Sequence, residues 1–103
     1  MSGGGRDELV RAVERRGDSH KIVRELLDRL DRYLRDLPRL LERAEPMTLE
    51  GEELLDLAER YYHDGRYYLA HDLPVEAFAC LSYAWALLKA GKEAGLLELE
   101  GEV

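Results

Sequence analysis

The stretch of sequence that decides the fold runs from residue 54 to residue 88 and reads LLDLAERYYHDGRYYLAHDLPVEAFACLSYAWALL. Its first part places apolar residues three and four positions apart, which is the spacing of one face of an α-helix. Residues 72–74 (DLP) then indicate a turn, because proline suits the first position of a new helix. We therefore predict helices over Leu49–His71 and Pro74–Ala90, with the second one ending at Gly91.

Gly65 lies in the middle of the first predicted helix. The pair Asp64-Gly65 is a turn signal between β-strands, but the flanking residues lack the alternation of strands. We therefore expect a continuous helix that carries this glycine at a cost of about 1 kcal/mol.

A third helix is predicted upstream, over His20–Ala44. Pro38 lies inside its apolar pattern, where proline removes a backbone hydrogen bond at a cost of about 3 kcal/mol. We expect a kink there, or a helix that breaks and resumes. Residues 45–47 end this helix, and Thr48 is the predicted N-cap of the next. The pattern consists of Leu26, Leu27, Leu30, Tyr33, Leu34, Leu37 and Leu41.

Before residue 20, apolar residues at helical spacing cover only a short segment. Residues 1–5 are predicted to be a disordered tail, since three of them are glycines. Arg6–Arg16 is predicted to form a short helix with Leu9, Val10 and Val13 on its apolar side, followed by a helix stop and N-cap at residues 17–19. The predicted fold is all-α: one domain over residues 6–103, an antiparallel three-helix bundle with a short additional N-terminal helix.

The last helix carries more apolar surface than a three-helix bundle can cover. Ser82 is the only non-apolar residue between Ala77 and Leu88, whereas each helix of such a bundle buries one stripe. The cover could be the Arg6–Arg16 helix, the apolar tail at Leu96, Leu97 and Leu99, or a partner chain. We expect a homo-oligomer or a protein partner on this helix. The predicted core and interface aromatics are Phe78, Tyr83, Trp85, Tyr61, Tyr62 and Tyr68.

Composition restricts the class of protein. The chain has 103 residues, 46% of them hydrophobic, and a net charge of −7, which favours one small domain over a disordered chain. The net acidity argues against nucleic-acid binding. No membrane span or signal peptide is recognised, so a cytoplasmic location is expected. The absence of Asn and Gln, with 12 Arg against 3 Lys, is typical of thermophiles. Cys80, the single cysteine, is predicted to lie in the core.

Four arginines of the first long helix share one stripe opposite the leucine face: Arg32, Arg35, Arg39 and Arg43. They could bind phosphates or acidic groups, or meet the acidic half of a second copy. We favour a third interpretation, in which the stripe is solvated. Ion pairs at four-residue spacing would then satisfy it, namely Glu25–Arg29, Asp28–Arg32 and Asp31–Arg35.

No metal or cofactor site is expected. His63 and His71 lie on one helix stripe with Tyr67, but eight residues correspond to about 12 Å of helix rise, which is too far for one metal ion. Glu59 and His63 could supply two ligands, yet a metal site needs at least one more from another helix.

Arg66 and His71 are the only enzymatic candidates. Their spacing resembles the signature of the HEPN ribonuclease superfamily, in which a histidine exchanges protons with a ribose hydroxyl and an arginine stabilises phosphate charge. Tyr67 replaces the polar residue that usually follows the arginine, and the acidic chain would repel RNA. We expect no enzyme, with a HEPN-like ribonuclease or RNA-binding domain as the alternative.

The hairpin resembles a known family in residues 58–64 (AERYYHD), 67–69 (YYL) and 76–88 (EAFACLSYAWALL). These match the pattern of the archaeal domain of unknown function family number 357 (DUF357). The resemblance implies a three-helix bundle, an archaeal source and an intracellular role that the family leaves unassigned. Gly65 stands where the family usually has alanine, Leu73 interrupts its short turn, and Lys89 replaces an acid.

Overall fold

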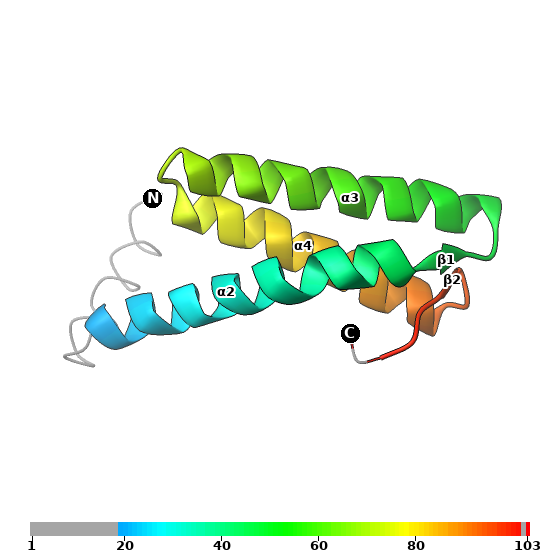
Figure 1. The fold of residues 1–103 in the computed structure, drawn as a ribbon, viewed down its shortest axis with the longest axis horizontal. Helices are drawn as coiled ribbons and strands as arrows, with labels where there is room; N and C mark the ends of the chain where they lie inside the picture. The colour runs from blue at the N-terminus through cyan, green and yellow to red at the C-terminus, as the bar shows by residue number, and fades with distance from the viewer. Residues whose placement is uncertain (1–18, 102) are drawn as a thin grey trace, which may run out of the picture.

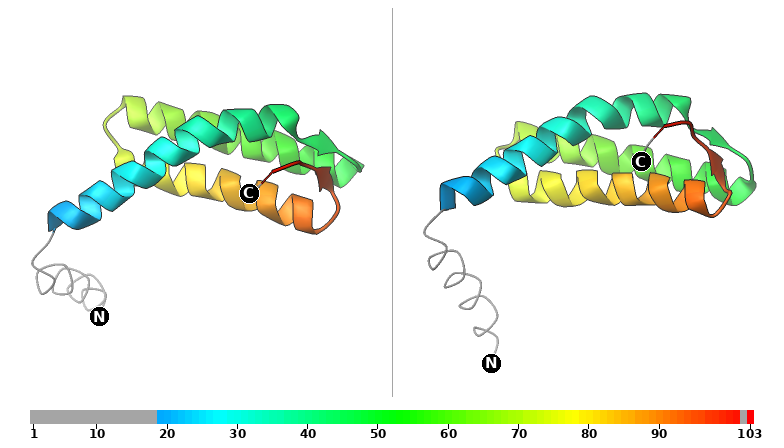
Figure 2. Two further views of the ribbon diagram at one scale, coloured as in Figure 1. Left: turned by 60° about the horizontal axis from the view of Figure 1, so that its bottom comes forward. Right: turned by 90° about the horizontal axis from the view of Figure 1, so that it is seen from below.

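The computed structural model describes residues 19–101 and residue 103. Helices α3 and α4 lie side by side as an antiparallel hairpin, and α2 crosses one face of it, mainly over α4 (Figures 1 and 2). The predicted all-α three-helix bundle is confirmed, while the predicted Arg6–Arg16 helix lies outside the described residues. The elements in chain order are α2 (Ser19–Arg43), β1 (Glu45–Pro46), α3 (Leu49–Ala70), α4 (Pro74–Glu93) and β2 (Leu97–Glu98).

The core forms where the three helices meet. Leu37 of α2 and Leu81 and Leu88 of α4 are the largest side chains that are fully buried. Ala58 and Ala77 are buried as well, so small residues let α3 and α4 approach each other closely. The leucine face of α2 therefore packs against the hairpin of α3 and α4.

Thr48 is the N-cap of α3, as predicted. Its backbone is extended, and its hydroxyl oxygen accepts a hydrogen bond of 2.9 Å from the backbone N–H of Gly51. The first N–H groups of a helix have no partner within the helix, so this bond satisfies one of them.

Replacing Thr48 with alanine is expected to lower the free energy of unfolding by about 1 kcal/mol, because the N–H of Gly51 loses its acceptor. Urea denaturation at one protein concentration measures this change. Thr48→Ser is the control, since serine keeps the hydroxyl and should cost far less. Equal losses in both variants would show that the threonine methyl group, and not the cap, carries the effect.

Helix α4 continues beyond the predicted end. Gly91 lies inside the helix, which ends two residues later at Glu93, so the predicted stop is wrong. The terminating glycine is Gly95, whose φ of +76° is the left-handed conformation that closes a helix. The backbone N–H of Leu96 donates to the carbonyl oxygen of Gly91 at 2.9 Å, which completes the closing motif.

Pro38 lies inside α2, which is continuous from Ser19 to Arg43. The break that the sequence suggested does not occur. Leu37 and Leu40 are buried on either side of the proline, so core packing on both sides offsets the lost hydrogen bond.

Two short strands, which the sequence analysis did not predict, close the open end of the bundle. β1 and β2 pair antiparallel, with Glu45 opposite Glu98 and Pro46 opposite Leu97. Leu97 and Leu99 are buried, and Leu97 packs onto Gly91, where a Cβ would come within 2.8 Å of it. The C-terminal tail thus covers the end of α4, which is one of the three covers expected from the sequence.

Candidate functional site

The side of α4 that α2 and α3 do not cover is exposed, and its charged residues Glu76 and Glu93 lie near its two ends. Five exposed apolar residues recur there at spacings of four, four, three and four, and we call them the outer stripe. Tyr83 at its centre is 51% exposed and Val75 at one end is 65% exposed. The outer stripe consists of Val75, Ala79, Tyr83, Ala86 and Ala90. The apolar surplus that the sequence indicated is therefore only partly covered within the described chain.

Tyr61 of α3 extends the outer stripe sideways. Its ring lies on that of Tyr83, with the ring centroids 4.5 Å apart and the planes inclined by 34°. Such tilted aromatic pairs contribute about 0.5 to 1.5 kcal/mol beyond their buried area. The contact holds Tyr83 in one orientation although half of its surface is in solvent.

The remaining predicted interface aromatics have other positions. Phe78 and Trp85 contact the ring of Tyr33 on α2, at centroid distances of 5.9 and 5.3 Å. These ring contacts therefore hold α2 against α4. Tyr62 is buried in the core, and Tyr68 is half-buried beside Tyr67. Tyr83 and Trp85 lie on different sides of α4, and only Tyr83 belongs to the exposed face.

The alanines of the outer stripe were not among the predicted interface residues. The sequence does contain a pattern that could have indicated them, because Ala79, Ala86 and Ala90 follow the same helical spacing as Tyr83. Alanine is equally common in cores, however, and the pattern of an almost wholly apolar helix does not indicate which side its neighbours cover.

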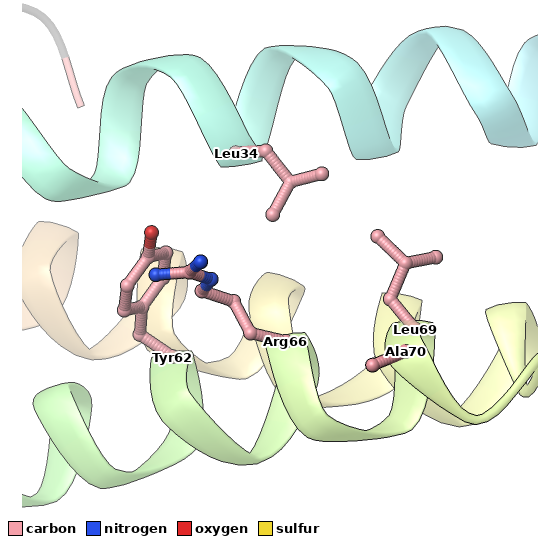
Figure 3. Close-up of a pocket in the computed structure, with 5 residues that line it drawn as sticks. All are labelled: Leu34, Tyr62, Arg66, Leu69 and Ala70. Carbon is pink, nitrogen blue, oxygen red and sulfur yellow. The ribbon is translucent and has the colours of Figure 1, made fainter.

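An open cleft of about 520 Å³ lies between α2 and α3 (Figure 3). Leu34 of α2 faces Leu69 and Ala70 of α3 across it. The guanidinium of Arg66 lies over the ring of Tyr62, 5.9 Å from its centroid. Arg66 thus has an aromatic partner and makes no ion pair with any residue that the structure describes.

His71 does not line this cleft. Its Nδ1 donates a hydrogen bond of 2.8 Å to the carbonyl oxygen of Tyr67, and its ring lies 4.1 Å from that of Tyr67. As the C-cap of α3, His71 is bound to the end of its own helix. Arg66 and His71 therefore face different partners and do not form a joint site.

The arginine stripe of α2 is exposed, but its ion pairs differ from the predicted ones. Arg35 Nε and Arg39 contact Asp36 Oδ1 at 3.2 and 2.8 Å. Burial raises the pKa of Asp36, yet the hydrogen bonds and charges of the two arginines lower it by more, so its pKa lies below the ordinary value. Over the part of the chain that is described, the three predicted pairs at four-residue spacing do not form.

Cys80 is half-buried and does not belong to the core, contrary to the prediction. Burial raises the pKa of its thiol, and the negative charge of Asp64 raises it further. A thiol with a raised pKa is a weak nucleophile at neutral pH, so Cys80 offers no activated group.

Within residues 19–101, no three His, Cys, Asp or Glu side chains are grouped so that they could hold a metal ion. None of the helices among these residues is long and apolar enough to cross a membrane.

A family model described as "Protein of unknown function (DUF357)" matches residues 27–97. The chain belongs to the DUF357 family. The match begins on α2 and ends at the first residue of β2. The family region therefore includes the cleft and the whole outer stripe. Neither curated proteins nor solved structures give a significant match to the chain.

The three departures from the DUF357 pattern have different surroundings. Gly65 is buried in α3, and a Cβ there would lie 2.6 Å from Leu81 Cδ2, so this chain has no room for the usual alanine. Leu73 is an exposed residue in the turn before α4, and Lys89 is exposed on α4. Only the first departure is dictated by packing.

Proposed function

We propose that this member of the DUF357 family is a self-assembly module without catalytic activity. It forms a two-fold symmetric dimer through the outer stripe of α4. The observation that carries the proposal is an exposed helix stripe of five apolar residues with a tyrosine at its centre. Tyrosine is enriched among the residues that dominate binding energy at protein interfaces.

Charge makes the outer stripe the favoured place for a contact between two copies. The chain carries a net charge of −7, so two copies repel each other at most relative orientations. The exposed arginines of α2 and the exposed acids of α3 would both have to be desolvated in a contact between copies. The outer stripe itself contains no charged residue, and Glu76 and Glu93 lie near its two ends, so two copies can meet along it while these carboxylates stay at the rim of the contact.

The shape of the outer stripe is self-complementary. It extends over 16 residues, or about 22 Å of helix, and Tyr83 lies close to its midpoint. Ala79 and Ala86 flank Tyr83 on the same face, so they leave room for a partner's ring. In an antiparallel pair of α4 helices, each Tyr83 can therefore pack over the small residues of the other copy.

Tyr83→Glu is expected to weaken dimerisation at least about 30-fold, because it removes a central aromatic anchor and places a charge in each half of the interface. Sedimentation or light scattering over a concentration series measures the dissociation constant. Tyr67→Glu is the matched control: the same substitution at a tyrosine that is 60% exposed on the other helix of the hairpin. It should dimerise like the wild type.

Two outcomes would contradict the proposal. The wild-type chain could remain a monomer up to millimolar concentration, or Tyr67→Glu could disrupt the dimer as strongly as Tyr83→Glu. Salt separates the proposal from a contact between the arginine stripe and the acidic half of a second copy. Raising the salt concentration screens net repulsion and should leave the proposed dimer intact, whereas it would dissociate a charge-based one.

A further inference from the structure

The N-terminal part of α2 exposes apolar side chains on one side. Val23 is 53% exposed and Leu27 is 51% exposed, whereas Leu30 on the next turn is 2% exposed. Figures 1 and 2 show the reason, because this end of α2 extends past the turn that joins α3 to α4. The hairpin is too short to cover it. The leucine face of α2 therefore continues beyond its cover.

Val23, Leu27 and Leu34 lie on the same side of α2, since they are separated by four and seven residues. Leu34 faces α3 across the open cleft. The uncovered side chains thus continue an apolar surface that begins at the cleft. An element that packs on Val23 and Leu27 would lie along α2 and point toward the cleft.

We propose that residues 6–16 fold back along α2 as a helix and cover Val23 and Leu27. Residues 1–18 lie outside the described part of the chain, which begins at the end of α2 that needs cover. The sequence of residues 6–16 carries Leu9, Val10 and Val13 at helical spacing. Only Gly17 and Asp18 separate this segment from α2, and a link of about two residues suffices for an antiparallel helix pair.

The length of the segment agrees with the length of the uncovered part of α2. Residues 6–16 as a helix would measure about 16 Å, and Leu27 lies about 12 Å along α2 from Ser19. With Gly17 and Asp18 as the turn, Val13 reaches the level of Ile22 and Val10 that of Glu25, so they lie within about 3 Å of Val23 and Leu27 along the helix axis. A segment of the same chain is favoured over a second copy, because its effective concentration is of the order of millimolar.

The test uses the full-length chain with Cys80→Ala as background and two introduced cysteines. Val10→Cys with Leu27→Cys joins positions that the proposal places in contact. Arg11→Cys with Leu27→Cys is the matched control, since residue 11 lies on a different side of the same segment. Oxidised glutathione drives disulfide formation, which is followed on a non-reducing denaturing gel, and circular dichroism checks that both variants keep their helix content.

The expected result is an intrachain disulfide in the Val10→Cys variant that forms at least about tenfold faster than in the control, as fixed geometry requires. Equal rates in the two variants would overturn the proposal, because an undocked segment brings both positions to Leu27→Cys equally often. A disulfide-linked dimer of the Val10→Cys variant would also overturn it, since the occupant would then be the segment of a second copy.

Discussion

Replacing Leu81 with alanine is expected to lower the free energy of unfolding by about 2 to 5 kcal/mol, the range for removing a large buried side chain and leaving a cavity. Leu81 is fully buried where α4 packs against Gly65 of α3. Chemical denaturation at one protein concentration measures the loss. An exposed leucine provides the control: Leu49→Ala, at a side chain that is 69% exposed, should change the stability far less.

The same position allows a sharper test of why α3 carries a glycine. In the wild-type chain, Gly65→Ala places a Cβ 2.6 Å from Leu81 Cδ2 and 2.7 Å from Leu81 Cγ. The strain should outweigh the gain of about 1 kcal/mol that alanine gives a helix. In the Leu81→Ala background the two contacts with Leu81 are gone and only the carbonyl oxygen of Ala77 stays close, at 3.3 Å, so Gly65→Ala should cost clearly less stability than in the wild-type chain. An equal loss in both backgrounds would contradict this account.

Replacing Gly51 with alanine is expected to detach the C-terminal strand. A Cβ at residue 51 would overlap the carbonyl oxygen of Leu96, which accepts a hydrogen bond of 2.9 Å from the N–H of Met47. Relief requires β2 to move away from β1, which exposes Leu97 and Leu99. The expected loss is about 2 to 4 kcal/mol, since burying one leucine side chain contributes about 1.5 to 3 kcal/mol.

Hydrogen exchange locates this effect as well as measuring it. The amide of Met47 should lose most of its protection in Gly51→Ala, while amides in the middle of α3 should keep theirs. Glu53→Ala, two residues further along α3 and exposed, is the control that changes the helix without touching the strand. If the amide of Met47 keeps its protection in Gly51→Ala, the start of α3 has moved instead of β2. That outcome would contradict the prediction.

The helices and their order could be predicted because each carries its own local signal. Apolar spacing indicated all three, Thr48 capped α3 as its side chain suggests, and Gly65 remained within a helix. The exposed face of α4 was foreseen only as a surplus of apolar residues. Its position could not be read from the sequence, because an apolar helix has no polar side that marks where the solvent lies.

Two of the differences concern residues whose role depends on packing against other parts of the chain. Gly91 does not end α4, and Leu97 packs against it. Of the kink or break that was predicted at Pro38, the break does not occur, because buried leucines on both sides hold the helix. The ion pairs of α2 are a local difference, because Asp36 binds two arginines of its own helix at spacings of one and three, whereas pairs at four-residue spacing were predicted.

For this protein, the amino-acid sequence by itself determined the three helices, the hairpin and the membership of residues 27–97 in the DUF357 family. The spacing of apolar residues and the helix caps involve only a few neighbouring residues, so they can be recognised from the sequence alone. Only the tertiary structure decided that β1 pairs with β2 and that Tyr83 lies on an open face. Those outcomes depend on which surfaces meet, and contacts between distant segments leave no local pattern.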